Sequence, residues 1–529
     1  MEQAAVYIGF FCIIVIFGQV FNKWVVPLAL ILTIAGMLFS FIPFFPRVTL
    51  NPSLVLNIFL PILLYQISAF SSWQEFKKNI RPIGLLSIGH VLFITIIIAI
   101  AIKQLIPEID WALAFVIGAV VAPPDDVAIV AIAEKISMPA RVISILEGES
   151  MLNDAAALTL FRFALAAEIT HQFMLIHALI TFFAIIIGET IFGLLMGFIL
   201  GELRKRITNP SLHVLASLLT PFLVYYPVNM LGGSGIIAVV ATGFVIGHYY
   251  STQFTPQFRL ISRAMWPAFS FAIQSLLFLL VGLDLSSILK GIAVMPLKPL
   301  IIDVITLVAL AIVGRFVWVY VSWPLFRNRN QKMNWPALFL ISWSGMRGGI
   351  SLAAALAVPF LPKVINGVNA RDLIVFLVFT VIIATLVLQG LALPWIVKLM
   401  GIEKVSQKER YSDHLAELTA RKSMISAVLR WLKNYKKQIA SDQKLFNEAK
   451  LYIELYRMEK LKLIARLDDH TDPLLHDEDT EIAEDTSLQL QIIEIERTTL
   501  LDLWKKEKIN YSVREKLLDH LDHRAKNLK

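Results

Sequence analysis

Four polar side chains on one predicted helix have the types and the spacing to bind a cation and a proton. Ser150 and Asp154 are four residues apart and share a helix face, with Glu149 and Asn153 one step round it. Hydroxyl, amide and carboxylate oxygens are the ligands that a hard cation requires. Because burial favours the uncharged form of a carboxylic acid, Asp154 could hold a proton or a cation, but not both. Such competition at one alternating-access site is sufficient for ion exchange.

Two apolar segments contain helix-breaking sequence near their middle. Residues 122–126 read A-P-P-D-D, and residues 344–349 read S-G-M-R-G-G. Two consecutive prolines lack N–H groups, so nearby carbonyls lose their helical partners and become available to an ion. Interrupted helices at matching positions of two inverted halves mark the binding site of many transporters. We therefore expect the two breaks to cross beside Asp154.

Two arginines inside apolar segments are the natural counter-charges for this site. A buried Arg stays protonated and pairs bidentately with carboxylates, so we expect Arg315 to pair with Glu149. In a dry site such a pair is structural and does not titrate. Arg347 is expected where two half-helix ends meet, and it could offset the partial charges of that crossing.

The composition places these residues in a membrane protein. Hydrophobic residues make up 57% of the 529 residues, charged residues make up 17%, and the mean hydropathy is +0.69. A soluble protein carries about 25% charged residues. The apolar blocks have the length of membrane-crossing helices, and the alternating segments of an outer-membrane barrel are absent from the sequence. A single cysteine, Cys12, excludes an intramolecular disulfide framework and a multi-cysteine metal site.

About 13 apolar segments are long enough to span a bilayer, which predicts an all-α integral membrane protein. Their approximate limits are 5–21, 25–42, 53–70, 80–102, 110–133, 142–167, 173–201, 208–230, 234–250, 264–288, 299–325, 335–358 and 371–399. We expect the first six and the last six to form two inverted repeats. Lys and Arg are more frequent in the loops on the side of Lys77 and Arg81. This side is therefore predicted to be cytoplasmic, with the N-terminus outside and the C-terminus inside.

The sequence changes character after about residue 403. Apolar residues recur at helical spacing between Leu415 and Leu432, and a stretch of acids and turn formers follows from Asp468 to Asp485. A further helical pattern runs from about residue 487 to the end. We predict a transmembrane domain over 1–403 and a helical cytosolic tail over 404–529. The tail is either regulatory or a solvated helix without a regulatory role. The net charge of +8 indicates membrane orientation and anionic lipid, and does not indicate nucleic acid.

Several motifs resemble the cation:proton antiporter-1 family, which includes the bacterial NhaP-type antiporters and the animal sodium/hydrogen exchangers. Residues 149–155 resemble its E-S-L-x-N-D-A signature, and Gly314-Arg315 is similar to the arginine of its eleventh span. Three further stretches are similar to F-L-P-P-I, F-x-L-x-G-L-x-L and G-G-L-R-G-A-V-S-L, namely 59–65, 279–285 and 344–352. The resemblance covers about residues 5 to 400.

The resemblance implies roles for individual residues. Asp154 would be the carboxylate that binds the ion and the proton, and Ser150 would be a cation ligand. Asn153, next to it, marks the group associated with electroneutral exchange, and Glu149 with Arg315 would be the structural ion pair. The family also implies a homodimer in the bacterial inner membrane, with a core of spans 4–6 and 11–13 that moves against a dimer-forming panel.

Two departures from the family pattern affect the ion site. Pro124 stands where the family has a threonine ligand, so it can offer only its backbone carbonyl, and Asp126 stands in place of a proline. Asp125 aligns with the family's acid, and adjacent residues on a helix point about 100° apart. We therefore expect Asp125 to face Asp154, whereas Asp126 faces an aqueous funnel or another polar side chain.

The second departure is Gln66, where bacterial relatives often have glutamate. With both departures, the choice among Na⁺, Li⁺ and K⁺ stays open, as do the stoichiometry and the pH range. The predicted function is a secondary antiporter that exchanges a monovalent cation, Na⁺ first, for protons and so serves pH regulation. The protein is not predicted to be an enzyme. It is predicted to need no cofactor and no metal ion other than the transported cation.

Other functions remain alternatives. A potassium/proton antiporter fits the same residues, and a cation channel or sensor could use the same scaffold. ATP-driven transport by this chain is disfavoured, since the sequence has no P-loop. An intramembrane protease is disfavoured because Asp125 and Asp126 are adjacent and do not lie on two helices.

Overall fold

The computed structural model describes residues 2–21, 26–42, 50–125, 138–171, 175–326, 334–360, 363–439, 443–469 and 486–528. The chain divides into two compact units. The first unit consists of residues 1–253 and 264–403. The second unit consists of residues 254–263 and 404–529. A short internal segment, 254–263, therefore groups with the C-terminal residues, and the predicted division into a transmembrane domain and a cytosolic tail stays a prediction.

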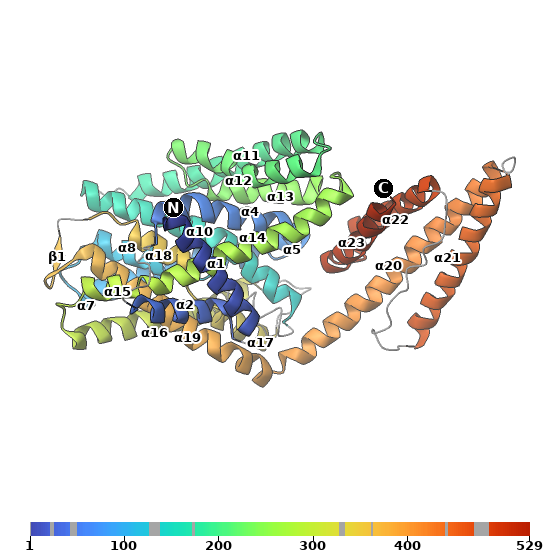
Figure 1. The fold of residues 1–529 in the computed structure, drawn as a ribbon. Helices are drawn as coiled ribbons and strands as arrows, with labels where there is room; N and C mark the ends of the chain where they lie inside the picture. The colour runs from blue at the N-terminus through green and yellow to red at the C-terminus, as the bar shows by residue number, and fades with distance from the viewer. Residues whose placement is uncertain are drawn as a thin grey trace. The chain divides into compact units, whose positions relative to one another are not determined.

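The first unit is almost entirely helical (Figure 1). Its helices before the second break are α1(Glu2–Phe21), α2(Leu28–Ser40), α3(Pro52–Leu54), η1(Val55–Phe59), α4(Leu60–Phe70), α5(Trp73–Lys78), α6(Ile80–Gly84), η2(Leu85–His90), α7(Val91–Leu105), α8(Trp111–Val121), α10(Ala140–Thr170), α11(Leu175–Lys205), α12(Pro210–Met230), α13(Ile236–Val245), η3(Ile246–Tyr250), α14(Pro256–Leu283), α15(Leu285–Gly291), α16(Leu297–Phe326) and α17(Trp335–Trp343). After the break come α18(Gly349–Leu356), an antiparallel hairpin of β1(Val364–Ile365) and β2(Val368–Asn369), and α19(Ala370–Leu399). The elements η1 and η2 are short π-helical stretches between α-helical ones, and η3 is a π-helical stretch at the end of α13.

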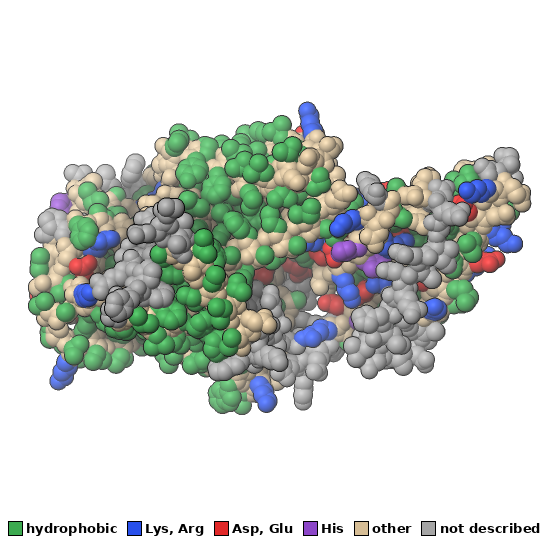
Figure 2. Space-filling view, viewed as in Figure 1, with side chains coloured by type: hydrophobic (Ala, Val, Ile, Leu, Met, Phe, Trp, Pro, Cys, Tyr) green, Lys and Arg blue, Asp and Glu red, His purple; other side chains and the backbone are tan. Residues whose placement is uncertain are grey.

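Length and composition support the membrane assignment. Seven described helices are long and apolar enough to cross a membrane, and further apolar helices such as Leu28–Ser40 and Trp111–Val121 are shorter. On the face in Figure 2, apolar side chains cover most of the first unit, whereas charged side chains gather on the second. A mostly helical membrane chain was predicted correctly. The total of 13 spans and the inverted repeats stay predictions.

Local sequence explains where several helices begin. Asn209 precedes Pro210, and its side-chain oxygen accepts the backbone N–H of Ser211 at 2.9 Å. Asn369 caps α19 in the same way, because its Oδ1 accepts the N–H of Arg371 at 2.9 Å. Asn at the cap satisfies a first-turn donor that has no partner inside the helix, and proline is tolerated at the first position.

One predicted segment differs from the structure. The tenth apolar segment was predicted over 264–288, but α14 begins eight residues earlier, at Pro256, and ends at Leu283 before the separate helix α15. Residues 256–263 are too polar to be recognised by hydropathy. In the structure they extend the helix beyond the apolar block, and they belong to the second unit.

Close contact between α11 and α13 depends on glycine. Gly193 and Gly197 recur four residues apart on the face of α11 that meets α13. A Cβ atom at Gly197 would lie 2.7 Å from the Cβ of Val245, and one at Gly193 would collide with the backbone of Ala238. Small residues let the backbones of two membrane helices approach closely. Lipid is as apolar as the helices, so close packing, and not the hydrophobic effect, holds the helices together.

The second unit has its own apolar core. Its helices are α20(Ile402–Gln438), α21(Gln443–Asp469), α22(Thr486–Lys505) and α23(Tyr511–Asn527). One cluster joins α20, α21 and α22 around Val428, and another joins α20, α22 and α23 around Leu500. The helical pattern predicted from residue 487 to the end is two helices, because Asn510 caps a new start by accepting the N–H of Val513.

Candidate functional site

The predicted cation-binding side chains are buried in the middle of α10. The exposed fractions of Glu149 and Asn153 are 1% and 0%, whereas those of Ser150 and Asp154 are 8% and 7%. The difference follows from the helix face, since Ser150 and Asp154 face a cavity. Glu149 and Asn153 contact protein groups instead.

The break after α8 is held by Asn153. Its Nδ2 donates to the carbonyl of Pro124 at 2.7 Å, and both groups are buried. The Pro124 carbonyl lies beyond the end of α8 at Val121, and this bond from α10 occupies one of its two lone pairs. Asn153 therefore positions the break in addition to standing beside Asp154.

The two interrupted segments touch each other directly. The backbone N–H of Asp125 donates to the carbonyl of Met346 at 2.6 Å. This bond joins the segment after α8 to the segment between α17 and α18, so the two breaks are brought together. Residues 126–137 lie outside the described part of the chain, so the expectation for Asp126 stays a prediction.

Arg347 donates hydrogen bonds to backbone carbonyls where the two interrupted segments meet. Its Nε donates to the carbonyl of Val121, the last residue of α8, at 3.0 Å, and its Nη1 donates to the carbonyl of Gly345. The Arg347 backbone N–H donates to Thr385 Oγ1 at 3.2 Å. Carbonyls at a helix C-terminus carry partial negative charge, so a buried cation beside them is favourable.

Asp125 lies against the start of α18. A Cβ atom added to Gly348, the residue before that helix, would collide with the Asp125 carboxylate. Gly348 has φ −125°, which any residue adopts, so glycine is required there by space and not by backbone strain. The neighbouring Gly349 is less confined, because its added Cβ would lie 3.4 Å from Leu277.

Glu149 and Arg315 form a bidentate ion pair. Arg315 Nη1 and Nη2 donate to the two carboxylate oxygens of Glu149 at 2.6 and 2.8 Å. Arg315 Nε donates to the carbonyl of Ile341 at 3.0 Å, so the pair joins α10, α16 and α17. Every side-chain nitrogen of this buried arginine has an acceptor, as an ion pair away from water requires.

The remaining predicted residues line a cavity. Its lining includes Pro124, Asp125, Ser150 and Asp154, together with residues of α4, α14 and α18. A second cavity is also bordered by Asp154, and Asp154 is the ionisable residue common to both. Two carboxylates that border one cavity repel each other unless a proton or a cation lies near them.

Sequence reasoning missed some polar residues of the site. Gln274 of α14 lines the first cavity, and Ser351 of α18 lines both. Gln274 is a polar residue in an apolar segment, and Ser351 is the serine of the stretch 344–352 that is similar to G-G-L-R-G-A-V-S-L, so both carried a signal. Gln66 does not belong to the lining of either cavity.

Glu189 has a structural position away from this site. Its carboxylate accepts the backbone N–H groups of Gly235 and Ile237 at 3.0 and 3.2 Å, and it also bonds Ser234. These N–H groups are at the start of α13, where the helix has unpaired donors and partial positive charge. Glu189 thus caps α13 from α11.

Known proteins are similar to this chain over most of its length. The family model described as "Sodium/hydrogen exchanger, transmembrane" matches residues 8–399. A "Sodium, potassium, lithium and rubidium/H(+) antiporter" of Bacillus pumilus is 30% identical over 394 residues, which is 71% of this chain and 59% of that protein. The chain therefore spans less than two thirds of that relative. The "Na(+)/H(+) antiporter ApNhaP" of Aphanothece halophytica is 30% identical over 76% of this chain and 75% of its own length.

A solved structure has the same fold. The sodium proton antiporter MjNhaP1 of Methanocaldococcus jannaschii superposes with a TM-score of 0.59 at 17% sequence identity. The match covers 76% of this chain and 100% of the other.

Proposed function

The chain belongs to the sodium/hydrogen exchanger family, and from this premise we propose that it exchanges a monovalent cation for protons across the bacterial plasma membrane. The single observation that carries the proposal is the position of Asp154, which borders both cavities and shares one of them with Asp125 and Ser150. Such a site suits a small cation with oxygen ligands, and no larger substrate is required.

The proposed mechanism uses one carboxylate for two ions. Asp154 binds a proton from one side, releases it to the other, and binds the cation in its deprotonated form. The Ser150 hydroxyl and the Asp125 carboxylate complete the cation's shell, and the Pro124 carbonyl can add one oxygen because it has a lone pair beyond the bond from Asn153. Because proton and cation exclude each other at Asp154, alternating access produces exchange without a further coupling device.

The arginines of the core keep a fixed charge throughout this cycle. Arg315 is held by Glu149 and by a carbonyl, and Arg347 is held by carbonyls of both interrupted segments. A guanidinium stays protonated under all physiological conditions, so neither residue competes for the transported proton. We assign them a positioning role at the crossing.

The cation is proposed to be Na⁺ first, with Li⁺ and K⁺ as further substrates. The printed name of the Bacillus pumilus relative includes all three ions, and Pro124 removes the hydroxyl that other members place beside the site. The potassium/proton antiporter is thus a variant of the same proposal.

Assembly and orientation complete the proposal. We propose a homodimer with the N-terminus outside and the second unit in the cytoplasm. The described surface of α11 carries exposed large apolar side chains, Ile187, Ile191 and Leu195 among them, which suit lipid or a second copy.

Exchange in reconstituted vesicles tests the function. Proteoliposomes with an internal pH-sensitive dye are given an imposed pH gradient, and Na⁺, Li⁺ and K⁺ are then added in turn. We expect each accepted cation to dissipate the gradient, with a rate that saturates with cation concentration. Cation current that persists without any proton movement would show a channel and would refute the proposal.

A further inference from the structure

Helix α14 belongs partly to the second unit. Residues 254–263 group with the C-terminal helices, whereas the same helix from Ala264 onward belongs to the first unit. Two arginines, Arg259 and Arg263, lie four residues apart on this first part of α14 and share a face.

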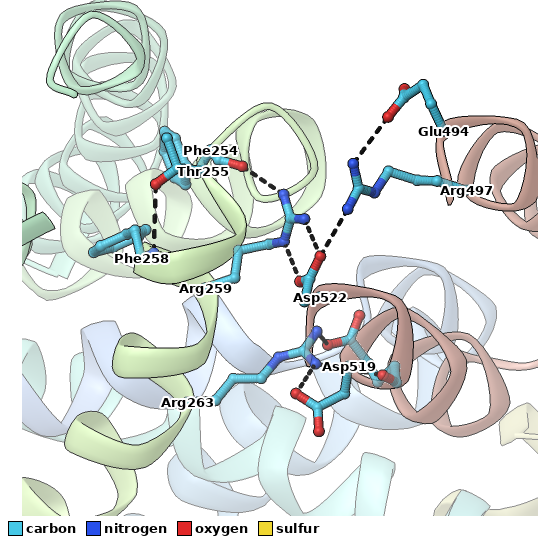
Figure 3. Close-up of polar contacts among 10 residues, drawn as sticks. Phe254, Thr255, Phe258, Arg259, Arg263, Glu494, Arg497, Asp519 and Asp522 are labelled. Atoms are coloured by element: carbon cyan, nitrogen blue, oxygen red, sulfur yellow. Dashed lines mark hydrogen bonds and ion pairs between the residues drawn. The ribbon is translucent and has the colours of Figure 1, made fainter. Parts of the chain in front are cut away.

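Arg259 is bound by a buried carboxylate of α23 (Figure 3). Its Nε donates to Asp522 Oδ2 at 2.6 Å, its Nη2 pairs with the other carboxylate oxygen, and its Nη1 donates to the carbonyl of Phe254. The exposed fractions of the Arg259 and Asp522 side chains are 5% and 0%. Bidentate arginine–carboxylate pairs of this kind are the strong and geometrically specific ones.

The same carboxylate is shared with another helix. Arg497 of α22 places Nη2 2.9 Å from Asp522 Oδ1, and its Nη1 pairs with Glu494 at 2.9 Å. Asp522 therefore links α14, α22 and α23, although it is 263 residues from Arg259 in sequence.

Arg263 makes a second contact of the same type. Its Nη1 lies 3.0 Å from Asp519 Oδ1, and its Nη2 pairs with Glu515. Glu515, Asp519 and Asp522 are spaced at i, i+4 and i+7, so they form one acidic face of α23. This face is complementary to the two arginines of α14, and we name the contact between them the clasp (Figure 3).

The clasped helix is the one that reaches the ion cavity. Gln274, Leu277 and Phe278 of α14 line that cavity, and Gln274 is eleven residues beyond Arg263, which is about 16 Å along a helix. Pro267 lies between them and cannot donate to the carbonyl of Arg263. A proline inside a helix is the usual place for it to bend, so the clasped end can swing relative to the cavity end unless something holds it.

We propose that exchange involves bending of α14 at Pro267 and that the clasp is an internal brake on this motion, because the acidic face of α23 holds the basic start of this cavity-lining helix. The partner is a segment of this same chain, and the inference rests on the proposed exchange function. Releasing the clasp should speed exchange, because fewer contacts must be strained during each cycle.

Three variants of the full-length protein test the brake. Arg259→Gln, Asp522→Asn and the double variant each remove the Arg259–Asp522 contact, although the two variants that carry Asp522→Asn also remove the ion pair with Arg497. We expect all three to raise the exchange rate in proteoliposomes by about fivefold or more, the lower end of common allosteric couplings. The double variant should be no faster than the faster single variant, because both substitutions release one contact.

Controls separate the clasp from general effects of charge. Asp502→Asn removes an exposed ion pair with Lys506 on the same unit and should leave the rate unchanged. Arg263→Lys keeps the positive charge and should stay close to the wild-type rate, whereas Arg263→Gln should be faster. Hydrogen exchange of α23 in the same samples reports release of the clasp without any reference to transport.

Each outcome decides one of the two proposals. Variants that loosen α23 in hydrogen exchange but transport at the wild-type rate, or more slowly, overturn the brake. Variants whose α23 stays as protected as in the wild type show that the ion pairs do not hold it, which also overturns the brake. A wild-type protein that exchanges no cation overturns the proposed function itself.

Discussion

The molecule contains two buried arginine–carboxylate pairs whose surroundings differ. Glu149 and Arg315 are enclosed in the first unit, and the remaining donor of the arginine is taken by a backbone carbonyl. Asp522 and Arg259 lie in the second unit, where a second arginine, Arg497, shares the carboxylate. Within the described residues, the hydrogen bonds of the first pair involve no third charged side chain, whereas the second pair belongs to a hydrogen-bonded charged network. An arginine–carboxylate pair can therefore be a permanent structural contact in the first unit and a contact that can be released in the second.

The two ion pairs are expected to have different roles. A buried pair whose charges share no hydrogen bond with a third charged group is costly to open, because each charge would be left without its partner. A carboxylate that keeps a second arginine after losing the first is less costly to separate. We therefore expect the Glu149–Arg315 pair to hold the structure of the ion site, and the Asp522–Arg259 pair to change the rate of exchange.

The largest expected effect is at the ion site itself. Asp154→Asn should reduce exchange to the level of empty vesicles, because an amide cannot trade a proton for a cation. The variant should stay monodisperse in detergent with an unchanged melting temperature, since no ion pair is broken. Substantial cation-driven proton movement by this variant would remove Asp154 from its proposed role.

The next effect tests the crossing. Gly348→Ala should severely impair exchange, since the added Cβ occupies the space of the Asp125 carboxylate. Gly349→Ala is the matched control, because its Cβ would make an ordinary contact at 3.4 Å, and it should retain most of the activity. Equal activity of the two variants in the vesicle assay would mean that the position of Asp125 does not matter.

The stability of the Glu149–Arg315 pair comes third. Removing one partner of a buried ion pair costs about 3–5 kcal/mol. Arg315→Gln and Glu149→Gln should each lower the melting temperature in detergent, and the double variant should be more stable than the sum of the two losses predicts. Additive losses in this double-mutant cycle would show that the two side chains do not interact.

The corresponding cycle on the clasp sharpens the comparison. Arg259→Gln and Asp522→Asn should show a smaller coupling energy than the Glu149–Arg315 cycle, because Arg497 still pairs with Asp522 when Arg259 is lost. The coupling is measured by chemical denaturation of the full chain, with hydrogen exchange of α23 as the readout. A coupling as large as that of the first pair would argue against a releasable contact.

The smallest effect concerns pH and the second unit. Burial raises the pKa of Asp413, and the hydrogen bond from Asn510 only partly offsets this. A carboxyl whose pKa is raised on folding contributes stability at low pH and loses it as the pH rises through the folded-state pKa. Asp413→Asn should therefore slightly protect the second unit at neutral pH and have no such benefit at acidic pH. Hydrogen exchange at both pH values checks the sign.

Several features were predicted correctly because they depend on local sequence. The family expected from the motifs is confirmed by the match over residues 8–399. Long apolar segments also gave reliable helix bounds: 142–167 corresponds to α10(Ala140–Thr170), and 371–399 corresponds to α19(Ala370–Leu399). Hydropathy failed at the start of α14, since residues 256–263 are helical through contacts that a local window does not contain.

The sequence by itself determined the membrane class, the family and the helix face that Ser150 and Asp154 share, since each follows from composition, motif or helical period. Only the tertiary structure decided that Asn153 binds the Pro124 carbonyl, that Asp125 fills the space beside Gly348, and that Asp522 holds Arg259. These contacts join segments far apart in the chain, and two of them involve backbone atoms or a missing Cβ. A carbonyl has no side-chain identity and no sequence period, so its partner is known only when the chain has folded around it.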